Sequence, residues 1–219
     1  MERVPDAPPT ALEERRTMTA IQKSDETPTA RRRKEQVLAA AADCFRREGF
    51  HGSSMAQISA AAGMSSGHIY HYFGSKEGIV AAIVERERSE LGLLFEEVKA
   101  ATQQVDVASA IVDKLPVGIA RNTDNCHVSL LMDILAEASR NSEIAQVIQR
   151  SDRELREEVY QFIGGDTPEA KSRYEILGAL LEGLSIRVLR NPDLDAVLDQ
   201  EMLRRVVRYV LTPPTDTAP

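Results

Sequence analysis

The sequence is poor in cysteine and has no long hydrophobic run. Cys44 and Cys126 are the only cysteines among 219 residues, and they form no Cys-x-x-Cys pair. This spacing argues against a disulfide framework or a zinc ribbon and fits a reducing compartment, so we expect a cytoplasmic protein. No apolar run approaches the roughly 20 residues of a membrane helix, and the N-terminus lacks the basic and apolar regions of a secretory signal. We therefore expect no membrane partner.

Strand signals and catalytic motifs are also missing. Few β-branched runs and no Asn-Gly or Asp-Gly turn occur, so the sequence predicts an all-α protein. It lacks HExxH, GxGxxG and a phosphate-binding loop, so we expect neither an enzyme nor a cofactor. His68 and His71 could hold a metal, and Ser65 with His68 could be a nucleophile and base. No third ligand and no orienting carboxylate lies nearby in the sequence, so we predict neither a metal site nor catalytic residues.

The net charge of −7 is distributed unevenly. Residues 1–30 carry four basic and six acidic side chains, residues 31–80 carry seven and four, and residues 81–219 carry 16 and 24. Positive charge is therefore concentrated in the short middle segment, as the neutralisation of phosphates requires. The acidic remainder should point away from a nucleic acid, because like charges repel each other.

The hydrophobic pattern divides the chain into two arms and a series of helices. Residues 1–29 have four prolines and little periodicity, so we expect a disordered arm, in which Met18 could be the true start. We assign 30–78 to one helical domain and 79–212 to a second, and we expect 213–219 to be a disordered tail. Caps, glycines and prolines predict helices at about 31–48, 54–62, 65–72, 76–103, 106–121, 125–139, 142–164, 168–190 and 194–211.

Two short helices, at 54–62 and 65–72, are joined by a turn at Gly63 and have the pattern of a helix-turn-helix. Ser54 and Gln57 form a capping box at the start of the first helix. Apolar residues of both helices would form the core of the unit, whereas the rest of the second helix is small or polar. Small residues at its start let the backbone approach DNA, and its free amides can bind a phosphate.

The segments GFHGSSMAQI (49–58) and AGMSSGHIYHYFGSKE (62–77) resemble the DNA-binding domain of the TetR (tetracycline-repressor) family. The family's pattern reads roughly G-F-x-x-T-S-V-x-x-I-A, then A-G-V-S-x-G-x-L-Y-x-H-F-x-S-K-E. The turn, the caps, the aromatic residues and the lysine all fall in register. The chain departs from the pattern at Ala56, Ser59 and Ser66, which removes possible DNA contacts and leaves the operator sequence open.

Carried over position by position, the resemblance implies a DNA interface. The second helix of the unit would touch DNA, Tyr70 would also brace that helix, and Lys76 would clamp a phosphate, as would the hydroxyl of Ser53 or Ser54. Three arginines just before the unit could contact DNA or could form a solvated helix start. The predicted DNA-binding residues are Arg31, Arg32, Arg33, Ser53, Ser54, Ser65, Ser66, Gly67, His68, Tyr70, His71 and Lys76.

Surplus apolar surface in the last two predicted helices indicates a homodimer. The helix at 168–190 is apolar over most of its circumference, and the helix at 194–211 carries an apolar stripe. One chain has too few helices to cover both surfaces, so we expect a four-helix bundle between two subunits, which the resemblance also implies. The predicted interface residues are Leu177, Leu181, Leu184, Val188, Leu198, Met202, Val206 and Val210.

The resemblance further implies a small-molecule pocket among the middle helices, and residues 130–142 and 182–184 are similar to the C-terminal domain of the BetI-like branch. We therefore expect a repressor that binds a palindromic operator in double-stranded DNA as a dimer and is released by an inducer. An activator, a regulator without a ligand, a helical enzyme and a protein-binding adaptor stay open as alternatives. The candidate pocket residues, each of which could instead be ordinary core, are Phe95, Leu115, Ile119, His127, Leu131 and Tyr160.

Overall fold

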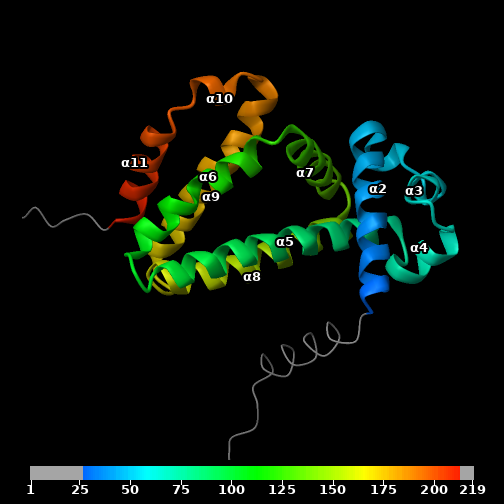
Figure 1. The fold of residues 1–219 in the computed structure, drawn as a ribbon, viewed down its shortest axis with the longest axis horizontal. Helices are drawn as coiled ribbons and strands as arrows, with labels where there is room; N and C mark the ends of the chain where they lie inside the picture. Colours follow the sequence, from blue (N-terminus) through cyan, green and yellow to red (C-terminus); the bar gives the residue numbers. More distant parts are fainter. Residues whose placement is uncertain (1–26, 213–219) are drawn as a thin grey trace, which may run out of the picture.

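The structure is a computed structural model that describes residues 27–212, and these residues form helices α2 to α11 without a strand (Figure 1). The predicted all-α class is confirmed. The arm at 1–26, the tail at 213–219 and the alternative start at Met18 lie outside the described residues. None of the helices between residues 27 and 212 is long and apolar enough to span a membrane.

Three helices form a head at one end of the molecule (Figure 1). The first begins three residues earlier than predicted, because the Thr27 side chain accepts a hydrogen bond from the Ala30 amide and Pro28 fits the first turn. Its helical path breaks at Gly49, where φ is +71° and where we expected the helix to end. The three helices are α2 (Pro28–Gly52), α3 (Met55–Ala62) and α4 (Ser66–Phe73).

The remaining helices form the C-terminal body and its link to the head. The long helix α5 leaves the head and runs through the body in contact with α8 (Figure 1). From α5 to α9, each helix lies within two residues of its predicted bounds. They are α5 (Lys76–Ala101), α6 (Val107–Thr123), α7 (Asn125–Ala138), α8 (Ser142–Ile163), α9 (Pro168–Arg190), α10 (Leu194–Val197) and α11 (Gln200–Leu211).

The prediction of one helix over 194–211 was wrong, because the chain breaks between α10 and α11. Leu198 is extended, with ψ at 108°. The Asp199 side chain then accepts hydrogen bonds from the amides of Glu201 and Met202 and starts a new helix. A good N-cap inside an apolar pattern therefore outweighed the continuity of that pattern.

Two hydrophobic cores divide the molecule, and α7 takes part in both. The head core surrounds Ile58 and Ile69, which are fully buried, and it includes Leu130 and Ile134 of α7. The body core is built mainly by α6, α9 and α11, and α7 contributes Val128. The head therefore packs on the body through a shared apolar interior as well as through the chain connection at α5.

Two of the four predicted dimer residues on α9 need correction, because the structure places them inside the chain. Leu184 and Val188 are buried in the body core, whereas Leu177 and Leu181 are half-buried and line a half-open cavity. When a helix is apolar on nearly all sides, its sequence does not show which face packs within the subunit and which face packs against another subunit. The large hydrophobic side chains that α9 leaves exposed are Ile176, Ile186 and Leu189.

The other predicted dimer residues lie on the outer side of the body. Met202 and Val206 of α11 are 55% and 43% exposed, and Leu198 and Val210 are half-buried. Val197 and Tyr209 are exposed beside them. The apolar stripe of the last helix therefore remains uncovered in the single chain, as the predicted interface requires.

Candidate nucleic-acid interface and internal cavity

Helix α4 presents a polar surface on the outside of the head. Ile69 is fully buried and fixes the helix to the head core, whereas Tyr70 is 51% exposed. The turn before α4 uses Gly63 in the left-handed region, and the Ser59 hydroxyl donates a hydrogen bond to the Met64 carbonyl. The remaining predicted reading residues of α4 are exposed or half-exposed: Ser65, Ser66, Gly67, His68 and His71.

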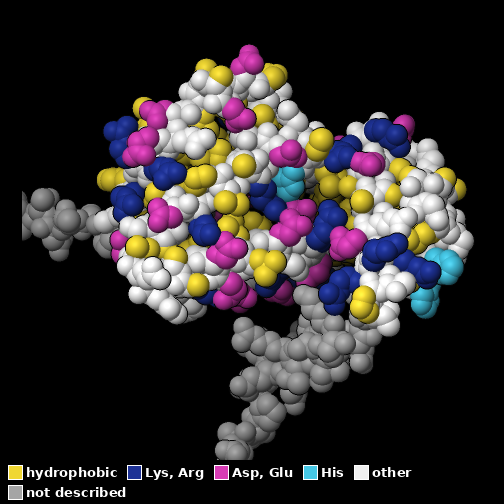
Figure 2. Space-filling view, in the orientation of Figure 1, with side chains coloured by type: hydrophobic (Ala, Val, Ile, Leu, Met, Phe, Trp, Pro, Cys, Tyr) yellow, Lys and Arg dark blue, Asp and Glu magenta, His cyan; other side chains and the backbone are white. Residues whose placement is uncertain are grey.

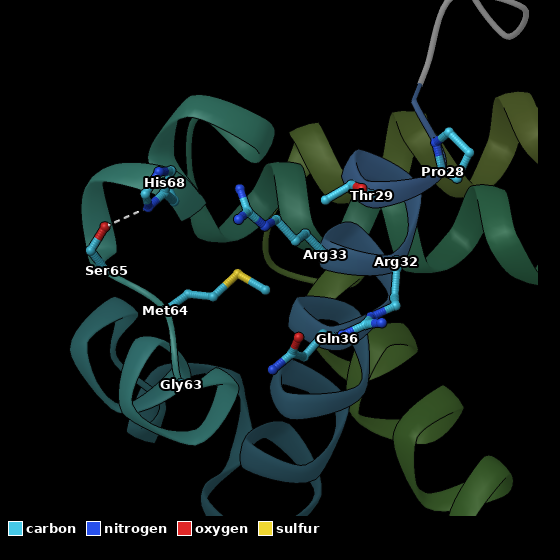
Figure 3. A pocket seen from close by; sticks show the side chains of 9 residues that line it. All are labelled: Pro28, Thr29, Arg32, Arg33, Gln36, Gly63, Met64, Ser65 and His68. Carbon is cyan, nitrogen blue, oxygen red and sulfur yellow. Dashed lines mark hydrogen bonds between the residues drawn. The ribbon is translucent and has the colours of Figure 1, made fainter.

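The start of α2 lies close to the start of α4, so that residues far apart in the sequence share one hollow. Arg32, Arg33, Ser65 and His68 all line this hollow of about 680 Å³. In Figure 3 the Arg33 side chain extends from α2 toward His68. Lysine and arginine side chains gather on the visible face of the head beside histidine side chains (Figure 2). The structure therefore brings two of the predicted arginines next to the predicted reading helix.

Ser65 stands at the N-cap position of α4, but its side chain does not cap the helix. Instead the Ser65 Oγ atom lies 2.8 Å from Nδ1 of His68, which orients the imidazole (Figure 3). The amides at the start of α4 are therefore left free of this hydroxyl and can bind a phosphate.

Residues 63–67, Gly-Met-Ser-Ser-Gly, also fit the spacing Gly-x-Ser-x-Gly of hydrolase nucleophiles. That motif requires a strand before the serine, whereas here helix α3 precedes it. Within residues 27–212, no carboxylate pairs with His68. The arrangement therefore lacks the group that would orient a catalytic base.

The segment 50–53, which we call the corner, comprises the end of α2 after the kink at Gly49 and the residue before the N-cap of α3. One prediction on this segment was wrong. Ser53 is only 1% exposed, and its hydroxyl donates to the Gly49 carbonyl, so it is not available to a phosphate. Lys76 Nζ donates to the carbonyls of Phe50 and Ser53, at 2.5 and 2.9 Å, and lies 4.2 Å from the centre of the Phe50 ring. Lys76 thus fastens the corner to the start of α5.

Two further predicted DNA-binding residues are exposed. Ser54 caps α3 by accepting a hydrogen bond from the Gln57 amide, and the Gln57 side chain completes the predicted capping box. Arg31 is exposed on α2 but does not line the hollow. Gln36, which sequence reasoning missed, donates to the carbonyl of Ala62 and braces α2 against the end of α3.

The body contains a half-open cavity of about 440 Å³, next to a second half-open hollow of about 400 Å³. The two share seven lining residues, so they form neighbouring parts of one half-open space. Phe95, Leu115, His127 and Leu131, four of the six candidate pocket residues, line the larger part. The volume lies in the range of small-molecule sites, and the walls are mainly apolar.

The structure places the other two candidates elsewhere. Ile119 is 3% exposed within the body core and does not line the cavity, because its side of α6 faces α9 and α11. Tyr160 lines a separate surface hollow with Arg153, Arg156 and Lys171. Helical periodicity identifies apolar positions but does not distinguish a cavity wall from a filled core.

One wall of the cavity is polar. Arg121 forms ion pairs with Glu87 and Glu90, and His127 Nδ1 lies 3.6 Å from Glu87 Oε2. Burial lowers the pKa of His127, an effect that the charge of Glu87 partly opposes, so the imidazole is neutral at neutral pH. Sequence reasoning missed Glu87, although a charge one helical turn from Ile83 and Leu91 on an apolar face could have marked it.

The opposite wall comes from α9. Burial raises the pKa of the Tyr174 phenol and of the Glu182 carboxyl group, and both side chains line both parts of the space. The Tyr174 hydroxyl lies 3.5 Å from Asp152. A few polar groups set in apolar walls are suited to orient a small ligand. No cluster within residues 27–212 has three side chains suited to hold a metal ion.

Two family models match the chain. The one described as "Bacterial regulatory proteins, tetR family" matches residues 37–83, which comprise most of the head. The one described as "BetI-type transcriptional repressor, C-terminal" matches residues 105–212, which comprise most of the body. Both matches agree with the resemblance that the sequence motifs indicated.

Curated and solved relatives point in the same direction. The chain is 26% identical to the HTH-type transcriptional regulator UidR of Escherichia coli K12 over 155 residues, which cover 70% of this chain and 74% of UidR. It is 31% identical to the regulator RutR of the same strain over 108 residues, 48% of this chain and 50% of RutR. The structure of Salmonella enterica GusR superposes with a TM-score of 0.65 at 24% identity and covers 84% of this chain and 97% of GusR.

Proposed function

This chain belongs to the TetR family of DNA-binding transcriptional regulators, and from this premise we propose that it is a dimeric repressor released by a small-molecule inducer. The observation that carries the proposal is the surface of α4. Its polar residues are exposed while Ile69 anchors it, and Arg32 and Arg33 flank it. Such a helix fits the major groove with its N-terminal residues at the base edges.

Each reading residue has a distinct proposed role. The Ser65 hydroxyl holds the His68 ring so that Nε2 points outward to a base edge or a phosphate. Arg31, Arg32 and Arg33 neutralise phosphates on one side of the groove, and the exposed Ser54 hydroxyl and Lys76 reach phosphates on the other. A Cβ atom added at Gly67 would meet nothing within 4 Å, so this glycine leaves room for the DNA backbone.

Dimerisation follows from the uncovered apolar residues of α9, α10 and α11. We propose that Ile176 and Ile186 of α9 pack with Met202 and Val206 of α11 against the same residues of a second subunit. A twofold axis through this interface would place two α4 helices in successive major grooves about 34–36 Å apart. The operator is then a palindrome.

The internal cavity supplies the regulatory site. We propose that a ligand with an apolar body lies against Phe95 and Leu131 and directs a polar group to His127 or Glu182. The ligand acts by binding more tightly to a conformer in which α5 and α7 have shifted and the heads no longer match the groove spacing. Occupancy of the cavity thus releases the operator.

Selection of bound sequences from random duplex DNA with the purified protein tests the proposal directly. We expect a palindrome with two half-sites about one helical turn apart and an affinity that falls steeply with salt. Gly67→Ala should fold normally, yet bind the selected operator about tenfold more weakly or worse, since one lost contact is worth about 1–3 kcal/mol. Gly92→Ala on α5, where an added Cβ also meets nothing, is the matched control. Selection that enriches no sequence would refute the proposal.

A further inference from the structure

The contact between head and body contains one buried carboxylate. The Glu137 side chain, near the end of α7, is only 4% exposed. Its Oε2 atom lies 2.9 Å from Nε2 of His51 in the corner and 3.5 Å from the Arg140 guanidinium. A buried carboxylate destabilises the folded state unless it is paired. The short contact to His51 and the longer contact to Arg140 therefore stabilise the buried Glu137 side chain.

The corner is held from two sides. Lys76 fastens the carbonyls of Phe50 and Ser53 to the start of α5, and Glu137 holds the His51 ring from α7. The His51 ring in turn packs against the edge of Phe50, with ring centres 5.4 Å apart. Because α3 begins directly after the corner, these contacts fix where the helix-turn-helix stands relative to the body.

Helix α7 also faces the cavity. His127 and Leu131 line the larger part of the space, and Leu135 lines the smaller part, less than one turn from Glu137. Leu130 and Ile134 of the same helix are buried in the head core. A shift of α7 along the cavity would therefore move Glu137 relative to His51.

We propose that Glu137 and His51 form a latch that sets the orientation of the DNA-binding head and that opens when α7 moves. With the latch closed, the carboxylate is paired and the corner is fixed. With the latch open, Glu137 retains only its longer contact to Arg140, and the head can adopt other orientations. Both are positioning residues, since neither lies in the surface of α4. The inferred control of head orientation stands without the proposed repressor function, whereas the inferred effect of this orientation on operator binding rests on that function.

The distance between two spin labels in one chain tests the latch in the absence of DNA and inducer, and this measurement does not depend on dimerisation. Spin labels at Ala60→Cys in the head and Asp113→Cys in the body, both at exposed positions, would be measured in a Cys126→Ser background diluted with unlabelled protein. We expect one narrow distance distribution for the parent. His51→Ala and Glu137→Leu should each broaden the distance distribution about twofold, because a packed element with two arrangements samples both once it is released. The double variant should broaden the distribution no further than either single variant.

Stability separates a latch from ordinary packing. His51 is 74% exposed, so His51→Ala leaves no void and should fold. Glu137→Leu removes the buried charge and should keep or raise the melting temperature while the head stays loose. Glu48→Gln, at an exposed glutamate one turn from the corner, should leave both stability and distances unchanged. A parent-like narrow distribution in both His51→Ala and Glu137→Leu would overturn the latch.

Operator binding supplies the functional readout. If only about one head pair in ten holds the correct orientation, the affinity for the full palindrome falls about tenfold, while the affinity for a single half-site is unchanged. Equal losses on both DNAs would overturn the positioning role and indicate damage to the reading surface. If the parent binds no operator, the repressor proposal fails, and the distance measurement still decides on the latch.

Discussion

Lys76 offers the sharpest test of how the head is built. Its ammonium group donates to the carbonyls of Phe50 and Ser53 and lies over the Phe50 ring. Replacement by methionine keeps the apolar stem and removes all three interactions. The two carbonyls would then lose their protein partner at the point where α2 ends and α3 has not yet begun.

The magnitude follows from these contacts. A hydrogen bond to a charged group contributes about 1.5–3 kcal/mol, and a cation–π contact adds about 0.5–1 kcal/mol. Because Lys76 is only half-buried, we use the lower ends, which gives a loss of about 3.5 kcal/mol. For a chain of this size, a loss of 1 kcal/mol lowers the melting temperature by about 2–4 °C, so Lys76→Met should melt roughly 7–14 °C lower.

Thermal and urea unfolding followed by circular dichroism would measure this loss. Lys99→Met is the matched control: Lys99 also lies over a phenyl ring, 4.5 Å from the centre of Phe95, and pairs with exposed Glu96, but the structure gives its ammonium no backbone carbonyl. We expect it to cost less than about 1 kcal/mol. Equal losses in the two variants would show that the carbonyl contacts do not stabilise the corner and would refute the reasoning.

Lys76→Met also tests whether Lys76 binds a DNA phosphate, as proposed. An ammonium group has three N–H donors, and two of them are used by the corner, so one is left for DNA. If Lys76 also binds a phosphate, Lys76→Met should reduce the slope of log affinity against log salt by about one. An unchanged slope would confine Lys76 to its structural role.

Two further predictions concern the dimer and the cavity. Met202→Glu should leave the fold intact, because Met202 is 55% exposed, yet weaken the dimer at least about 100-fold, since an unpaired charge in the interface costs several kcal/mol. Analytical ultracentrifugation would measure the dissociation constant of the dimer, with Leu93→Glu on the outside of α5 as the control. An unchanged dissociation constant in Met202→Glu would place the interface elsewhere. Burial lowers the pKa of His127 in the folded state, so at acidic pH this side chain binds more protons in the unfolded chain than in the folded one. Acid therefore destabilises the parent. His127→Asn should make the melting temperature fall less steeply below pH 6.5. A slope identical to that of the parent would contradict a buried neutral imidazole.

The sequence predicted the helices well wherever a cap or a breaker coincided with the apolar pattern. Ser54 and Gln57 form the expected capping box, and α9 has its predicted bounds. The pattern failed at Asp199, whose side chain can cap a helix or lie on the polar face of one. Which role it takes depends on how α11 packs against α6 and α9, and this packing has no local signal.

The exposed surface of α4 was predictable for a similar reason. Turn, caps and buried residues in the region 54–73 all agree with one structure, so the exposed positions of α4 followed from the positions that must be buried. Ser53 was misplaced because serine suits both a phosphate contact and a buried hydrogen bond to a carbonyl. Its burial depends on the kink at Gly49, which turns the corner back onto α2.

The interface on α9 shows where periodicity carries no information. Leu177, Leu181, Leu184 and Val188 belong to the chain's own cavity and core, whereas Ile176 and Leu189 lie outside. Both sets are aliphatic, so burial within a subunit and burial between subunits give the same pattern in the sequence. The two sets differ in what covers them within the chain: α6, α7, α8 and α11 pack against α9 and leave the second set exposed. If the proposed interface includes α9, a charge placed at Ile176 should therefore act on association, and a charge placed at Leu184 should act on folding.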